Sequence, residues 1–192
     1  MRIVRNLAAF AAPGLALLLA GAAPADRVIP LPEADDEALI IPADSPVKFR
    51  GFDKYGVAHF SGKFVLTGSF TYGCWSSCAD YNGPVTEGYL DVRIEADPEL
   101  AARLPHWKLR KGPMLVLINR EQRFARTVAT REQHRSLLSG KLGSVQGRAA
   151  IIVDDFRTGI ECDSENHSAR FISLAKLPKI AKVDFDGDYG CG

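Results

Sequence analysis

The sequence predicts a mainly β protein of the α+β class, in which a small curled antiparallel β-barrel carries two or three short helices between its strands. One observation behind this prediction is the alternation of apolar and polar residues over 58–72, because a period of two is typical of a half-buried strand. The other is the order of the predicted elements, which lacks the regular strand–helix alternation of a parallel sheet. An antiparallel sheet that closes on itself fits this order best.

Residues 1–25 have the three parts of a secretory signal peptide. Arg2 and Arg5 give a positively charged start, an uncharged Ala/Leu-rich segment covers 7–20, and Ala23-Pro24-Ala25 is a small-residue cleavage site. We therefore expect cleavage after Ala25 and a periplasmic or extracellular product. No later apolar run is long enough to span a membrane, so we expect no transmembrane anchor.

Residues 26–46 are predicted to form an extended, partly mobile arm that is dispensable for folding. Four prolines and five acidic residues between 30 and 46 oppose a regular helix and keep the segment solvated. Only Leu39-Ile40-Ile41 is apolar enough to dock on a folded body. The remaining residues, 47–192, suffice for one β-barrel-like domain with its own core and an acidic C-terminal tail.

The strands are predicted from alternation or from a continuous apolar run. In 58–72 we expect one long strand or a tightly linked pair, with Gly62 and Gly68 on the apolar parity, where glycine lets a strand bend or another backbone approach. Four further strands are predicted: 89–95, 114–118, 145–153 and 168–175. We interpret 114–118 as fully buried and 154–159 as a turn.

Three short helices are predicted between the strands. Asp97-Pro98 begins the first, because aspartate is a good N-cap and proline suits the first helical position. Asn119 and Thr130 each precede a glutamine by three residues, which is the spacing of a capping box. The two boxes predict helices over 120–129 and 131–139.

Two glycine-bearing strands carry a resemblance to a known fold. His59-Phe60-Ser61-Gly62-Lys63-Phe64-Val65-Leu66-Thr67-Gly68 and Gly143-Ser144-Val145-Gln146-Gly147 resemble strands of the OB-type five-stranded barrels of bacterial secreted proteins. The resemblance covers about 58–175 and is one of topology, and the helices exceed the single helix usual there. It implies a five-stranded barrel but no particular activity, because one fold serves many functions.

The four cysteines all follow the leader. An even number in an exported chain predicts two disulfides among Cys74, Cys78, Cys162 and Cys191. We favour Cys74–Cys78 with Cys162–Cys191, because a short loop closes at a small entropic cost, and the other two pairings stay open. A redox site is a weaker alternative, since the C-x-x-C spacing is exceeded by one residue. A zinc site that includes His167 is weaker still, because only one short cysteine pair exists.

A turn-rich aromatic loop over 72–83 is the first candidate binding surface. It carries Tyr72, Trp75 and Tyr81, and rigid aromatic side chains on loops commonly anchor binding partners. The alternative is that these rings cap one end of the barrel. A local disulfide would hold the rings in place before binding, so we favour this loop over the second surface.

The second candidate surface is a basic block over 103–148, which holds 11 basic and 2 acidic residues. Arg123, Arg131 and Arg135 are its candidate ligand-binding residues, since arginine suits bidentate contacts with phosphate or carboxylate. A solvated surface, or pairing with acidic segments of the same chain, is the alternative. The block holds only two aromatic residues, so we expect no specific nucleic acid as a partner.

Two acidic clusters are weaker candidates. Carboxylates near His167 would suit the acid–base chemistry of a hydrolase. These carboxylates belong to Asp154, Asp155, Glu161, Asp163 and Glu165. In the tail, Asp184, Asp186 and Asp188 alternate as at the start of a calcium loop, but the glycine comes too early and no bidentate glutamate follows. We therefore expect no catalytic residue, no bound metal beyond this weak calcium candidate, and no cofactor.

These observations predict a soluble exported binding or interaction module of the bacterial envelope, without catalysis of its own. The expected partner is an envelope protein, a glycan or an anionic ligand. An envelope hydrolase that uses the cluster near His167, or a structural accessory of an envelope complex, is the alternative. The sequence has no nucleophile elbow, H-E-x-x-H, P-loop or G-x-G-x-x-G motif, which removes the enzymes that depend on them.

Overall fold

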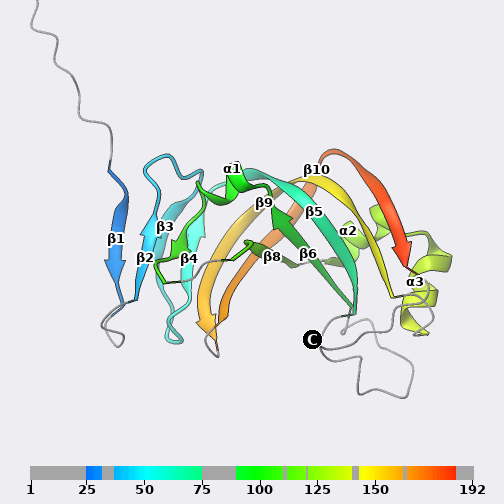
Figure 1. Ribbon diagram of the computed structural model, residues 1–192, viewed down its shortest axis with the longest axis horizontal. Coiled ribbons are helices and arrows are strands. Elements are labelled where there is room, and N and C mark those ends of the chain that lie inside the picture. The colour runs from blue at the N-terminus through cyan, green and yellow to red at the C-terminus, as the bar shows by residue number, and fades with distance from the viewer. Residues whose placement is uncertain are drawn as a thin grey trace, which may run out of the picture.

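The computed structural model is mainly β, with its two longer helices at one end of an arched molecule (Figure 1). It describes residues 25–31, 37–74, 90–109, 112–119, 121–139, 143–161 and 164–184. The fold is organised around one barrel, a small sheet beside it and two helices that follow one another at the opposite end.

Five strands close the barrel. They are β5 (Phe64–Cys74), β6 (Leu90–Ala96), β8 (Leu115–Asn119), β9 (Ser144–Glu161) and β10 (Ser164–Asp184). Their order is β5-β6-β8-β10-β9, and β9 pairs back with β5, so the last strand lies between the third and the fourth. This arrangement confirms the predicted small OB-like barrel.

One pair in the barrel corrects the expectation of a purely antiparallel sheet. Strands β8 and β10 run parallel, with Val116 opposite His167, while the other barrel pairs are antiparallel. The reason lies in the connections: β9 and β10 form a hairpin, whereas α2 and α3 separate β8 from β9 and allow a different direction.

The stretch predicted as one long strand or a linked pair is a strand with a bend. β4 (Ala58–Ser61) and β5 follow the same edge of β9: Ala58 pairs with Thr158 and Phe64 with Val153, so one extra residue lies between. Gly62 occupies the bend with φ +123°, a backbone conformation that favours glycine. At Gly68 an added Cβ would lie 1.9 Å from the carbonyl oxygen of Glu95, so β6 approaches closely there. Both predicted glycine roles are confirmed.

The turn predicted over 154–159 is wrong, because β9 continues through it to Glu161. Asp155, with φ 51°, lies at a bulge, and Phe156 and Thr158 beyond it are fully buried. β10 is correspondingly longer than the predicted 168–175. Asp154 and Asp155, which suggested a turn, lie within the sheet and accept hydrogen bonds from arginine side chains.

β8 is half-buried rather than fully buried. Val116 and Ile118 face the core, but Leu115 on the opposite parity is 37% exposed. The strand is paired on both edges, and yet its outer face is not covered by another layer. A continuous apolar run therefore did not distinguish burial on one face from burial on two.

The described part of the predicted arm is a hairpin joined to the barrel. β1 (Arg27–Pro30) and β2 (Ala38–Ile41) pair with each other, and β2 pairs with β7 (His106–Trp107). Leu39 is fully buried and Ile41 is 8% exposed, so the one apolar segment that the sequence allowed to dock does so. The remaining strand, β3 (Lys48–Phe52), pairs with β4.

The predicted helices are confirmed as α1 (Pro98–Ala101), α2 (Glu121–Val128) and α3 (Arg131–Leu138). Asp97 is the N-cap of α1, and Thr130 and Gln133 form the capping box of α3. α2 is fastened to the barrel by Phe124, whose ring centroid lies 5.5 Å from that of Phe70 and 5.7 Å from that of Phe171. Within the described residues, no helix has the length and apolarity needed to cross a membrane.

Candidate functional site

A groove of about 850 Å³ runs along α2 and α3. Its apolar lining consists of Ala125, Ala129 and Leu138, which are buried or half-buried. Its polar lining consists of Gln122, Arg126, Thr130, Arg131, His134 and Arg135. No aspartate or glutamate is among the described residues that line it, and these residues make the groove positively charged over an apolar base.

Helical spacing explains why the arginines gather at this groove. Arg131 and Arg135 are four residues apart on α3 and therefore lie on one face of it. On α2, Arg126 follows Gln122 by the same interval, while Phe124 and Val128 turn into the core. The capping box at Thr130 starts α3 two residues after α2 ends, and residues of both helices line the groove.

The groove arginines have no acidic partner among the described residues. Within the described part of the chain, no carboxylate oxygen lies within 4.0 Å of the guanidinium of Arg126, Arg131 or Arg135. Other described arginines do have such partners: Arg148 lies 2.6 Å from Asp97, for example. Guanidinium groups that are close together and uncompensated favour the binding of an anion.

His134 is held at the groove by a residue of the barrel. Its Nδ1 and the phenol oxygen of Tyr72 are 2.5 Å apart, and the two rings are nearly parallel, at 8°. Tyr72, which the sequence suggested as a partner-binding residue, is only 1% exposed and packs in the core, where it supports α3. The reason is that β5 extends to Cys74, which gives Tyr72 the inward parity of Phe70.

The structure brings together two of the three predicted arginines. Arg131 and Arg135 line the groove, whereas Arg123 lies over the ring of Phe171 in β10, 6.0 Å from its centroid. The third arginine that lines the groove is Arg126, which was not among the predicted site residues. The signal that would have found it is the four-residue spacing from Gln122, which puts both residues on one face of a helix.

Several predicted site residues lie outside the described residues. They are Trp75, Tyr81, Cys78, Cys162, Cys191, Asp163, Asp186 and Asp188. Cys74 and Asp184 are the last residues of β5 and β10, respectively. The aromatic loop, both disulfides and the weak calcium candidate in the tail therefore stay predictions. Among the described residues, no group of three or more potential metal ligands occurs.

The described carboxylates near His167 are engaged with other groups. Arg170 donates two hydrogen bonds to Asp154, at 2.7 and 2.8 Å, and this bonding raises the pKa of Arg170 above its ordinary value. Arg157 donates to Asp155 at 2.6 Å. Asp154 and Asp155 are thus partners of strand arginines, an arrangement that stabilises the sheet and does not present two free carboxylates to a substrate.

Glu165 is engaged as well. It accepts a hydrogen bond from the backbone N–H of Trp107 at 2.9 Å, and its Oε1 lies 3.2 Å from Nε2 of His167. The His167 side chain is only 2% exposed and stacks on Phe156, with ring centroids 5.8 Å apart. Glu165 of β10 thus contacts β7 of the small sheet through Trp107, and His167 of β10 packs on Phe156 of β9.

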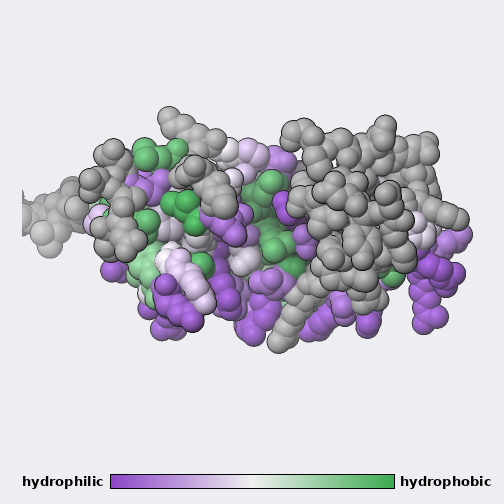
Figure 2. Space-filling view, turned by 90° about the horizontal axis from the view of Figure 1, so that it is seen from below, coloured by the Kyte–Doolittle hydropathy of each residue, from purple (hydrophilic) through white to green (hydrophobic). Residues whose placement is uncertain are grey.

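A second hollow, of about 660 Å³, lies against the outer face of β8. Leu115 and Leu117 line it, together with Arg93 of β6, and residues of the β9–β10 hairpin complete it. Figure 2 shows the underside of the arch, where hydrophobic side chains gather along the middle between hydrophilic ones. This hollow has both acidic and basic lining residues, Glu161 and Arg157 among them, so its charges are balanced.

Comparison with known proteins identifies no relative: no family model, no curated protein and no solved structure matches the chain. The function is therefore argued from the chemistry of the described residues, in which the arginine groove has the clearest ligand preference.

Proposed function

We propose that this protein is an exported binding module of the bacterial envelope, which holds an anionic ligand in the groove along α2 and α3 and catalyses no reaction of its own. The observation that carries the proposal is the convergence of Arg126, Arg131 and Arg135 on a groove whose described lining holds no acidic residue. The leader over 1–25 supports the location outside the cytoplasm.

The lining also indicates the class of ligand. Three guanidinium groups suit a phosphate or carboxylate, which each can contact through two parallel N–H donors. Ala125, Ala129 and Leu138 offer apolar contact beside them. A ligand with a small apolar part attached to a phosphate or carboxylate uses both kinds of lining. A fully hydrated inorganic ion uses only one.

Binding relieves a cost that the free protein carries. Like charges four residues apart on a helix are destabilising by roughly 0.2–0.5 kcal/mol, and Arg131 and Arg135 have this spacing. A bound anion compensates both. We therefore expect ligand binding to raise the melting temperature of the protein, in addition to producing a direct binding signal.

The test is calorimetric titration of the exported chain with phenyl phosphate, which combines a phosphate with an apolar ring. We expect affinity to fall steeply with increasing salt, because screening weakens charge-dependent binding. Arg131→Gln with Arg135→Gln should weaken binding at least tenfold. Arg123→Gln is the matched control, since Arg123 is on the same helix as Arg126 but lies over Phe171.

Other outcomes would contradict the proposal. Binding that ignores both salt and the groove variants places the ligand elsewhere. If Trp75→Ala then abolishes it, the aromatic loop is the binding surface, as the sequence favoured. Equal losses in the Arg123 variant and the groove variants would mean that general positive charge, and not the groove, attracts the ligand.

A further inference from the structure

The C-terminal half of β10 carries lysines at every third position, which is an unusual spacing for a strand. Lys176, Lys179 and Lys182 pair with Ala150, Arg148 and Gln146 of β9, which are only two residues apart. One residue of β10 is therefore extra in each interval, as in a β-bulge. Because Ala150, Arg148 and Gln146 share one face of the sheet, the three lysines share it too.

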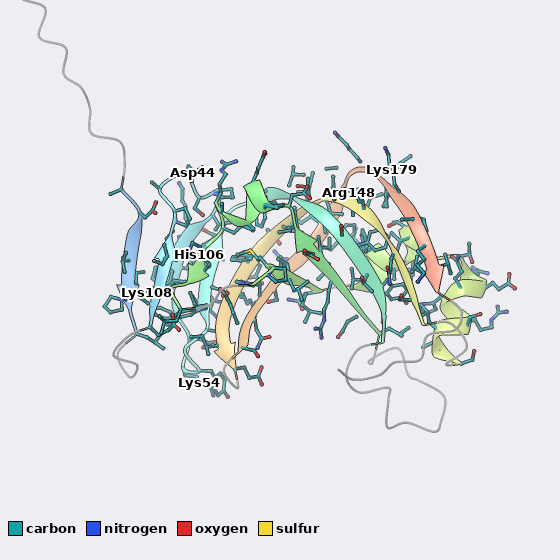
Figure 3. All side chains as sticks on the ribbon, viewed as in Figure 1. Asp44, Lys54, His106, Lys108, Arg148 and Lys179 are labelled. Carbon is teal, nitrogen blue, oxygen red and sulfur yellow. The ribbon has the colours of Figure 1, made fainter. Side chains whose placement is uncertain are left out.

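This lysine row is on the outside of the barrel. The residues of β9 with the opposite parity, such as Ala149 and Ile151, are buried, and the three lysines are exposed. The β9 partners of neighbouring lysines are two residues apart. Neighbouring lysines are therefore spaced by roughly 7 Å along the strand direction. In Figure 3, Lys179 lies at the crest of the arch, beside Arg148 of the neighbouring strand.

Two lysines of this row, Lys176 and Lys179, are uncompensated by any described residue, since neither has an ion-pair partner in that part of the chain. Arg148, in contrast, is paired with Asp97 at 2.6 Å. The face therefore presents positive charge to whatever approaches the crest of the arch.

An apolar side chain is exposed between Lys176 and Lys179 in the sequence. Leu177 is 85% exposed, the highest value of any large apolar residue that the structure describes. Ile180, 45% exposed, pairs with Gly147 and therefore belongs to the opposite face of the sheet. Lysines, bulges and Pro178 also keep a strand edge from pairing with another chain. That protective role gives no reason for a fully accessible leucine between two lysines.

We propose that this face of β10 docks on an anionic lipid bilayer, with Lys176 and Lys179 against the headgroup phosphates and Leu177 entering the boundary between headgroups and acyl chains. Lysines near an anionic membrane surface are attracted to it, and an adjacent apolar side chain adds affinity when it leaves water. A soluble polyanion satisfies the lysines but gives Leu177 no apolar environment. The presence of both therefore favours lipid, independently of any ligand in the groove.

The experiment is co-sedimentation of the exported chain with vesicles of phosphatidylglycerol and phosphatidylcholine, compared with vesicles of phosphatidylcholine alone. We expect binding to the anionic vesicles only. The double variant Lys176→Gln, Lys179→Gln should lower partitioning roughly tenfold or more. Leu177→Ser should lower it on the order of tenfold, because the apolar contribution is lost.

Lys54→Gln is the matched control. Lys54 is an exposed lysine at the lower end of the molecule in Figure 3, away from the crest, so its loss should leave partitioning unchanged. All four residues are exposed, and equal melting temperatures would show that the variants stay folded.

Three results would overturn the proposal. They are no binding of the unaltered chain to anionic vesicles, equal binding to neutral vesicles, and an equal loss in the Lys54 variant. Lysine-dependent binding that is indifferent to Leu177→Ser, and that heparin reproduces, would show a polyanion site instead. The groove variants Arg131→Gln and Arg135→Gln separate this proposal from the proposed function, since they should abolish phenyl phosphate binding and leave docking on vesicles largely intact.

Discussion

The phenol oxygen of Tyr72 lies 2.5 Å from Nδ1 of His134, which joins the inner face of β5 to the helix that carries Arg131 and Arg135. A buried barrel residue thus positions one wall of the groove. The connection predicts that the stability of the barrel and the affinity of the groove are coupled at this contact, although Tyr72 is not among the described residues that line the groove.

Tyr72→Phe tests that coupling. The variant keeps the ring and removes the hydroxyl, so His134 loses a hydrogen-bond partner in a part-buried position. We expect a loss of about 1 kcal/mol in the free energy of unfolding, measured with urea, and weaker binding of phenyl phosphate. His134→Gln gives a second view of the same contact. Unchanged affinity in both variants would show that α3 is held in place by other contacts.

Thr158→Val tests how the small sheet is fastened to the barrel. The indole N–H of Trp107 donates to Thr158 Oγ1 at 3.0 Å, and both residues are buried. Valine preserves the shape but leaves the indole unsatisfied, at a cost of roughly 1–3 kcal/mol in urea unfolding. Thr158→Ser retains the hydroxyl and should lose less. Equal losses would assign the effect to packing and not to the hydrogen bond.

Leu39→Ala tests the contribution of the N-terminal hairpin. Leu39 is fully buried, and removal of a buried leucine side chain costs roughly 2–5 kcal/mol. Val28→Ala, in the same hairpin at a residue 57% exposed, should cost little. We expect the same contrast when melting temperatures are measured, and a strong loss for a chain that begins near residue 46. A shortened chain that melts within a few degrees of the full one would restore the interpretation of a dispensable arm.

Gly68→Ala tests the close approach of β6 to β5. The new Cβ would lie 1.9 Å from the carbonyl oxygen of Glu95, so two backbones must separate. We expect destabilisation of at least about 1–3 kcal/mol, or failure to fold. At Gly112 an added Cβ meets nothing within 4 Å, so Gly112→Ala is the control and should be neutral. A tolerated Gly68→Ala would contradict the described spacing of the two strands.

Arg148→Ala should make stability less dependent on acid. A hydrogen bond from the Arg148 guanidinium is the main cause that lowers the pKa of Asp97 below its ordinary value. A lowered carboxyl pKa contributes stability that is present above the unfolded value of about 3.9 and is lost as the pH falls through the folded value. The Asp97 side chain is 32% exposed, so we expect a loss below about 1 kcal/mol at pH 7.

The measurement is urea unfolding of both proteins between pH 7 and pH 2. The difference between them should shrink toward zero once the pH is below the folded pKa of Asp97. A difference that persists at pH 2 would show that Arg148 acts through its packing and not through the charge of Asp97.

Local patterns determined a large part of this fold. The alternation over 58–72 fixed which residues of β4 and β5 face the core, and the capping box at Thr130 marked where α3 begins, because both depend on residues close together in the chain. The roles of Gly62 and Gly68 in the bent strand were predictable for the same reason. Arg131 and Arg135 were recognised from the concentration of arginine in the basic block, which also is a local property of the chain.

Long-range pairing decided the rest. Whether Asp154 belongs to a turn or a strand depends on Arg170, which lies 16 residues away in the sequence and beside it in the sheet. The contact of Tyr72 also depends on a distant residue, since His134 is 62 residues away in the sequence. The lysine row depends on strand pairing as well, because each two-residue step of β9 is matched by three residues of β10. The sequence by itself determined local geometry and charge. Only the tertiary structure decided which of these charges are neutralised and which face solvent, because neutralisation requires a partner that folding brings within a few ångströms.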